Sequence, residues 1–214
     1  PPRSTLFPYT TLFRSTRQAL ELIYENRFGV AIATKSSLIT RDIDVLQKIK
    51  NFSPVLCKIT ITAFDDDLCR KIERNVSVSS ERFVTIKKLS EAGVFTGVLL
   101  MPVLPYITDN EENILNIVRH AKENGARFVY AAFGVTLRAN QRDYFYKKLE
   151  QQFPGLKQVY VDRFHNDYSC SSPNAQSLYR RFANECEKLD LFYKMPDIIK
   201  AYKSGYDSKQ ITMF

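Results

Sequence analysis

The sequence predicts an α/β protein built on a parallel sheet, and three observations lead to this fold class. Short apolar runs alternate with segments of helical periodicity four times between residues 16 and 153. The apolar runs are nearly continuous, as in strands that are covered on both faces. Polar residues follow several runs, at the strand ends where parallel barrels carry their active sites. These features predict an incomplete parallel β/α barrel with about four β/α units, followed by a helical C-terminal extension.

Four apolar runs carry the predicted strands. Each run is short and is bounded by polar or turn-forming residues, which favours a buried strand over a helix. The first run stops at the polar residues 34–36, the second carries Thr60 and Thr62 at its end, and the third stops at Pro102. In chain order, the predicted strands are residues 30–33, 55–62, 94–101 and 128–133.

Helical segments separate these strands. Apolar side chains recur within them at helical spacing, as Phe83, Ile86 and Leu89 do in the fourth segment. Thr108 and Asp109 are predicted to cap the fifth segment, because short polar side chains satisfy free amide groups at helix starts. In chain order, the predicted helices are residues 16–27, 43–49, 64–72, 79–93, 109–125 and 141–153.

The pattern changes after Pro154. Residues 156–164 fit either a strand or a loop, and helices are predicted over residues 174–189 and 195–203, with a loose tail after them. The predicted organisation is therefore an adapter-derived segment, a partial barrel and a C-terminal extension. These three parts span residues 1–15, 16–153 and 154–214.

The first part is set aside because of its sequence. Residues 1–15 match, codon by codon, one reading frame of a short-read sequencing adapter. The alternative is a signal peptide, but Pro8 interrupts the apolar stretch, which does not reach the roughly 7–15 residues of such a segment. The natural chain is therefore expected to start near Thr16, as a fragment of a longer protein.

The composition is that of an ordinary globular protein, with 44% hydrophobic and 25% charged residues. No apolar run approaches the roughly 18 residues of a transmembrane helix, so we expect no membrane association and a cytoplasmic location. The formal net charge of +8 is compatible with a nucleic-acid partner. The cations are spread along the helices, however, so a solvated surface is the alternative interpretation.

The cysteines do not form a ligand set. Their separations contain neither a C-x-x-C pair nor the spacing of a metal site, so free thiols in a reducing compartment are predicted. His120 and His165 lie far apart and have no paired ligand, so no metal site is assigned. The four cysteines are Cys57, Cys69, Cys170 and Cys186.

An ordered set of short motifs resembles a known family. The motifs occupy residues 34–36 (TKS), 59–62 (ITIT), 72–76 (IERNV), 82 (R), 93–98 (GVFTGV) and 101–109 (MPVLPYITD). Together they resemble radical S-adenosylmethionine proteins of the spore photoproduct lyase-like group, often described as DNA repair photolyases. The resemblance runs from about residue 16 to residue 153.

The resemblance implies a partial TIM-type barrel, a 4Fe-4S cluster and S-adenosylmethionine as cofactor. In that family a C-x-x-x-C-x-x-C loop after the first strand holds the cluster, and a Glu at the end of the second strand meets the methionine amino group. Neither occurs in this chain, whose strands would correspond to the third to sixth of the family. The chain as written is therefore expected to be inactive and to lack the cluster ligands, and no catalytic residue is assigned.

The resemblance also implies which residues contact S-adenosylmethionine. Lys35 would pair with the cofactor carboxylate, and Ser36 would hydrogen-bond the same ligand. The alternatives are a Lys extending from a strand tip into solvent and a Ser that caps a turn. Met101 and Pro102 would contact the adenine, and core packing with a chain stop is their alternative role.

Two threonines complete the predicted cofactor-binding set. Thr60 and Thr62 share one face of their strand, because side chains alternate along a strand with period two. A buried hydroxyl needs a partner, since leaving it unpaired costs about 1–3 kcal/mol. The cofactor, water and a backbone carbonyl are the alternatives for that partner.

Other polar residues receive structural roles. By resemblance Glu73 and Arg82 form a recurrent pair, interpreted as a salt bridge that fixes the loop between them rather than as chemistry. Cys57 opens a strand at the end away from the site, and Cys170 lies in a loop of unassigned position. Cys170 is kept as a candidate thiol donor of a hydrogen atom.

The sequence leaves several hypotheses for function. The first is a fragment of a radical S-adenosylmethionine enzyme, a lyase-like DNA repair protein with a nucleic-acid substrate and an external electron donor. The alternative is a cluster-free nucleic-acid-binding α/β module, which predicts a basic face with aromatic residues that stack on bases. A third is that the isolated chain is inert, because an open sheet edge invites aggregation.

Overall fold

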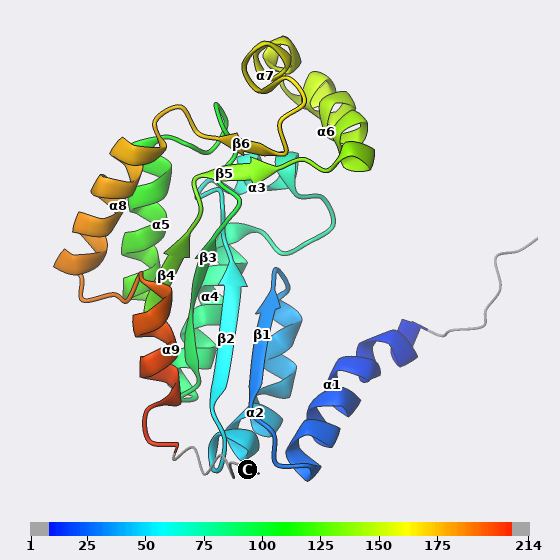
Figure 1. Ribbon diagram of the computed structural model, residues 1–214. Helices are drawn as coiled ribbons and strands as arrows, with labels where there is room; N and C mark the ends of the chain where they lie inside the picture. The colour runs from blue at the N-terminus through cyan, green and yellow to red at the C-terminus, as the bar shows by residue number, and fades with distance from the viewer. Residues whose placement is uncertain (1–8, 207–214) are drawn as a thin grey trace, which may run out of the picture.

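The computed structural model describes the backbone of residues 9–206 and the side chains of residues 15–206 (Figure 1). Its centre is a four-stranded sheet in which every neighbouring pair is parallel, in the order β1-β2-β3-β4. This confirms the predicted α/β class and the four β/α units. The strands are β1 (Val30–Thr34), β2 (Val55–Thr60), β3 (Phe95–Leu100) and β4 (Phe128–Ala131).

One face of the sheet carries most of the core. Helices α2, α4 and α5 pack against it, and α1 packs on α2. The sheet contributes Val98 and Ile59 to this layer, and α4 contributes Ile86 and Leu89, all at most 1% exposed. In chain order, the helices before β4 are α1 (Tyr9–Glu25), η1 (Ser37–Asp42), α2 (Ile43–Lys50), α3 (Asp66–Ile72), α4 (Ser79–Glu91) and α5 (Glu111–Glu123).

The opposite face is covered at the end where the strands begin. The strand register places Ala31, Leu56 and Phe95 side by side on this face. Ile198 of α9 (Met195–Lys203) packs with Leu56 and Phe128 in a second apolar cluster. The carboxyl ends of the strands lie beyond this cluster, and polar side chains gather there.

The C-terminal extension packs on the sheet domain. Helix α8 (Ala175–Lys188) lies against α5, where Arg119 Nε is 2.6 Å from Glu185 Oε1 (Figure 1). Strands β5 (Gly134–Thr136) and β6 (Ser169–Ser171) pair in antiparallel fashion, with α6 (Ala139–Gln152) between them in the chain. These contacts fix the position of the region after Pro154 relative to the sheet.

Residues 156–164 correct the sequence prediction of a strand or loop. They form the helix α7 (Leu156–Phe164), because Leu156, Tyr160 and Phe164 recur every four residues. Tyr160 is fully buried and its hydroxyl donates a hydrogen bond to the Pro105 carbonyl, at 2.8 Å. The helix therefore holds the loop that follows β3.

Two further differences concern helix starts. Helix α5 is capped by the Asn110 side chain, which accepts from the Asn113 amide at 2.9 Å, not by Thr108 or Asp109. Thr108 Oγ1 instead accepts from the Leu104 amide, so it closes the preceding turn. Helix α1 begins at Tyr9, earlier than the predicted start at residue 16. Residues 1–8 of the predicted adapter segment and 207–214 of the predicted tail lie outside the described residues.

None of the helices in the described part of the chain combines the length and apolarity that a membrane span requires.

Candidate functional site

The predicted cofactor-binding residues meet at one edge of the sheet. Because β1, β2 and β3 are parallel, their carboxyl ends lie together. Lys35 and Ser36 follow β1, Thr60 ends β2, and Met101 with Pro102 follows β3. Thr62 lies two residues beyond the end of β2 rather than within it, which corrects its predicted place in the strand.

The Glu73 carboxylate is the centre of this edge. Its Oε1 lies 2.8 Å from Lys35 Nζ and 3.4 Å from Thr62 Oγ1. Its Oε2 accepts a hydrogen bond of 2.6 Å from Arg82 Nη2. Burial by itself raises the pKa of Glu73, but the hydrogen bonds from Lys35 and Arg82 outweigh it and lower the pKa below its ordinary value. The carboxylate therefore stays ionised and joins the ends of β1 and β2.

Arg82 extends this network into the backbone. Its side chain is 1% exposed and donates through Nη1 to the Thr60 carbonyl at 2.8 Å. Through Nε it donates to the Ser77 carbonyl at 2.7 Å. Together with its bond to Glu73, these contacts tie the end of β2 to the loop before α4. The structure thus confirms the predicted Glu73–Arg82 salt bridge and its loop-fixing geometry.

Asn113 is a member of the site that the sequence did not single out. Its Nδ2 donates to the carbonyls of Thr62, at 3.0 Å, and Thr108, at 2.9 Å. Its Oδ1 accepts from the Phe64 amide at 2.6 Å. This buried side chain holds the turn after β2 against the start of α5. The sequence does contain one signal that could have identified Asn113: a side-chain amide in the first turn of an amphipathic helix, on its apolar face.

Lys35 and Ser36 differ in their availability to a ligand. The Lys35 side chain is 39% exposed, so its ammonium contacts Glu73 and also solvent. Ser36 Oγ accepts from the Leu38 amide at 3.2 Å and thereby caps η1. The Ser36 side chain thus has the alternative role named from the sequence, the cap of a turn.

The remaining predicted residues line the same edge with different exposures. Thr62 has Glu73 as partner of its hydroxyl, which is none of the three alternatives considered from the sequence. The Thr60 carbonyl accepts a hydrogen bond from Arg82, and Thr60 as a whole is 8% exposed. Met101 is 37% exposed, so core packing does not explain it. A surface methionine next to Pro102 offers an apolar contact at this edge.

The cysteines are buried and protonated rather than poised as nucleophiles. All four are free and buried, as predicted from their spacing. Cys170 lies in β6 rather than in a loop, and burial raises its thiol pKa. Burial also raises the pKa of Cys57 to about 12. A raised pKa removes the thiolate that makes a cysteine reactive as a nucleophile, but hydrogen-atom donation needs the protonated thiol, so that role of Cys170 stays a prediction.

The described side chains do not fit an iron–sulfur cluster. Within the described part of the chain, no group of three or more His, Cys, Asp or Glu side chains could hold a metal ion. A cluster needs several thiolates converging on one point. The donor set does fit the polar end of S-adenosylmethionine, because a half-exposed ammonium at Lys35 matches a carboxylate.

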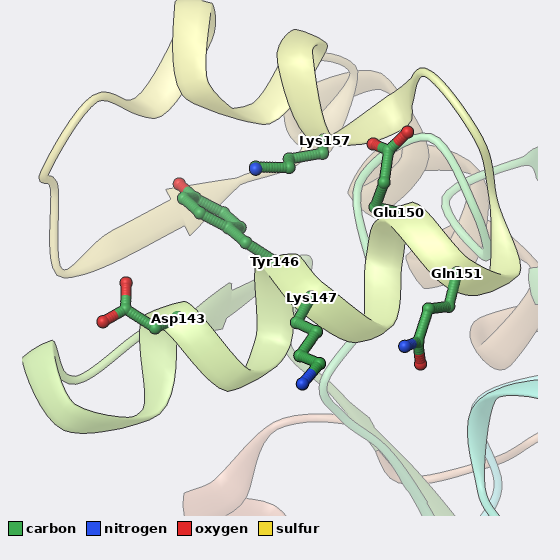
Figure 2. Close-up of a pocket in the computed structure, with 6 residues that line it drawn as sticks. All are labelled: Asp143, Tyr146, Lys147, Glu150, Gln151 and Lys157. Atoms are coloured by element: carbon green, nitrogen blue, oxygen red, sulfur yellow. The ribbon is translucent and has the colours of Figure 1, made fainter.

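Two hollows lie on opposite faces of α6. A groove of about 680 Å³ runs between α6, the loop after α3 and the loop after β3, and Ile72 and Arg74 on either side of Glu73 line it. Figure 2 shows the second hollow, of about 480 Å³, between α6 and α7. There the Tyr146 hydroxyl has no hydrogen-bond partner among the described residues.

Comparison with known structures supports the fold. A spore photoproduct lyase variant with bound AdoMet and dinucleoside spore photoproduct superimposes with a TM-score of 0.59, at 13% identity, over 91% of this chain and 60% of that chain. The chain therefore shares its fold with spore photoproduct lyase over this region. Spore photoproduct lyase in complex with dinucleoside spore photoproduct superimposes with a TM-score of 0.55, at 14% identity, over 82% of this chain and 53% of that one.

Sequence comparisons find relatives whose names state no function. No protein-family profile matches the chain. An uncharacterized protein of Mycobacterium tuberculosis is 28% identical over 156 residues, which are 73% of this chain and 44% of that protein. An uncharacterized protein of Methanocaldococcus jannaschii is 31% identical over 142 residues, 66% of this chain and 50% of the relative. The chain thus spans half or less of these relatives.

Proposed function

We propose that this chain is part of a radical S-adenosylmethionine enzyme and carries residues that bind the cofactor's methionine and adenine. The observation that carries the proposal is the Lys35–Glu73–Arg82 network, which lies at the carboxyl ends of the strands in a fold of this type. In the whole protein a 4Fe-4S cluster would supply the electron that cleaves S-adenosylmethionine. This chain contains no C-x-x-x-C-x-x-C set, and no step is assigned to its residues through the cluster.

Lys35 is the proposed carboxylate-binding residue. Its ammonium has free donors beyond the one that Glu73 uses, and an ammonium–carboxylate hydrogen bond is among the stronger kinds in proteins. Glu73 and Arg82 hold the strand ends, so they position Lys35 without touching the ligand. Met101 and Pro102 contribute apolar contact to the adenine, and Thr60, Thr62 and Ser36 form the polar border.

The proposed substrate is a nucleic-acid lesion, handled in a lyase-like reaction with an external electron donor in the cytoplasm. The support is indirect: the solved neighbours bind a dinucleoside photoproduct, and this chain carries a formal net charge of +8. The alternative is a cluster-free nucleic-acid-binding module, with which the formal net charge of +8 is also compatible.

Calorimetric titration of the full chain with S-adenosylmethionine tests the proposal. Lys35→Met is expected to weaken binding by roughly 10- to 100-fold, the factor that loss of one charged hydrogen bond implies. Lys87→Met, which removes an exposed cation from the middle of α4, is the control and should bind as the wild type does. Equal affinities of wild type and Lys35→Met, or no binding by the wild type, would contradict the proposal and favour the nucleic-acid module.

A further inference from the structure

The groove between α6 and the loop after α3 borders the candidate site. Its walls are the end of α3 with the loop that follows it, the loop that follows β3, strand β5 and one face of α6. Glu73 points to Lys35 and Arg82, while its chain neighbours Ile72 and Arg74 line the groove. A molecule lying in the groove therefore passes within one residue of the network that holds Lys35.

The groove carries positive charge without compensation. Lys71, Arg74 and Lys148 line it, and none of the described residues in its walls is acidic. Among the side chains described from residue 15 to 206, none of these three cations forms an ion pair. Lys148 donates to the Gln151 amide oxygen, which carries no charge. An anionic ligand would therefore meet three cations that have no internal counter-ion.

The hollow on the other face of α6 shows that this charge is local. Asp143 and Glu150 lie there with Lys147 and Lys157, so its charges balance (Figure 2). On the groove side, α6 contributes one charged side chain, Lys148, and α3 with the loop after it contributes Lys71 and Arg74, so all the charge there is positive. The groove, not the helix as a whole, is suited to a polyanion.

Aromatic side chains lie among the cations. Tyr144 is 67% exposed, and Phe145 and Phe153 also line the groove. Lys71 Nζ lies 4.1 Å from the centre of the Phe153 ring, and Lys148 Nζ lies 5.7 Å from that of Tyr144. Cations beside exposed rings are the arrangement with which proteins bind the phosphates and bases of single strands.

We infer that this groove binds a single-stranded segment of nucleic acid, with Tyr144 stacking on a base and Lys71, Arg74 and Lys148 contacting phosphates. A single strand is favoured over a duplex, because paired bases are stacked on each other and hide the faces that a ring would contact. The inference deepens the proposed function and rests on it, since it identifies where the strand that carries the substrate lies.

Fluorescence anisotropy with a labelled oligothymidylate of about ten nucleotides tests the inference on the full chain. The logarithm of the affinity should fall with the logarithm of salt concentration with a slope of about −2, as three phosphate contacts to a single strand imply. Tyr144→Ala should weaken binding by roughly 5- to 100-fold, the factor for one lost stacking contact. Lys148→Glu should weaken binding and reduce the salt slope by about 0.7 or more.

Lys147→Glu is the matched control, because it makes the same charge change one residue away on the other face of α6. Lys147→Glu should reduce the affinity for the oligothymidylate by less than tenfold, and by less than Lys148→Glu does. The thermal unfolding midpoints of all variants show whether they are folded. Three results would each overturn the inference: equal loss in Lys147→Glu and Lys148→Glu, unchanged binding in Tyr144→Ala, or binding of polyphosphate, polyglutamate or duplex as tight as that of the oligothymidylate.

The two proposals fail separately. Tyr144→Ala should bind S-adenosylmethionine as the wild type does, and Lys35→Met should bind the oligothymidylate as the wild type does. A wild-type chain that binds the oligothymidylate but not S-adenosylmethionine would refute the proposed function alone, and one that binds S-adenosylmethionine but not the oligothymidylate would refute the groove alone.

Discussion

Replacing Glu73 by Gln removes one charge from a largely buried network and leaves its shape nearly unchanged. Arg82 is 1% exposed and the Glu73 side chain 12% exposed, so water cannot solvate the guanidinium when its counter-ion is lost. Breaking a buried pair from one side costs about 3–5 kcal/mol. Since Gln keeps one oxygen that can accept from Arg82, we expect the lower end, about 3 kcal/mol of unfolding free energy.

Urea unfolding followed by circular dichroism measures this loss. With a denaturant dependence of about 2 kcal/mol per molar, the midpoint should fall by about 1.5 M while the slope stays constant. Asp67→Asn is the control, because it makes the same chemical change in an exposed pair, where Asp67 Oδ1 lies 2.6 Å from Arg70. That pair should contribute less than about 1 kcal/mol. If Glu73→Gln and Asp67→Asn lose equal stability, Arg82 does not depend on the Glu73 charge.

Three further predictions concern pH, thiols and packing. Folding lowers the pKa of Glu73, so its stabilising contribution should be present above the unfolded-state pKa of 4.5 and be lost as pH falls through the folded-state pKa. The wild type should therefore lose more unfolding free energy on acidification than Glu73→Gln does. Parallel pH profiles of the two proteins would contradict this. A thiol reagent should leave Cys57 and Cys186 unmodified in the native chain, because burial raises the pKa of both thiols to about 12. The same reagent should label both cysteines in urea. Rapid labelling of the native chain would refute their burial. Gly97→Ala should lower the free energy of unfolding by about 1–3 kcal/mol, because an added methyl group meets the Phe128 backbone oxygen and ring, and an unchanged urea midpoint would show that the sheet yields there.

The strands and most helices followed from local patterns in the sequence. Near-continuous apolar runs placed all four strands of the sheet to within about two residues, since burial on both faces excludes polar residues. Helix α7 was missed because Val159 and Val161 favour strands in isolation. Its helical form is supported by tertiary contacts, in which Tyr160 bonds Pro105 and Phe164 packs beside it.

The candidate site was only partly predictable. The parallel topology implied that residues after β1, β2 and β3 share one edge, and the structure places them there. The side chains that contact these residues could not be predicted in this way. Lys35 contacts Glu73, which lies in a distant segment of the chain, and no local pattern in the sequence connects the two. Asn113 was missed for the same reason, since its contacts with Thr62 and Phe64 depend on how α5 packs.

The network at the strand ends has a consequence for which anions it accepts. Lys35 and Arg82 each bring one positive charge and Glu73 one negative charge, so together they carry a single net positive charge. One carboxylate neutralises that charge, whereas a doubly charged phosphate leaves an excess of negative charge beside the buried Glu73. Before any ligand arrives, Lys35 and Arg82 share the Glu73 carboxylate as counter-ion. We therefore expect the proposed cofactor site to match the lone carboxylate of an amino acid and to resist the phosphates that the proposed groove would attract.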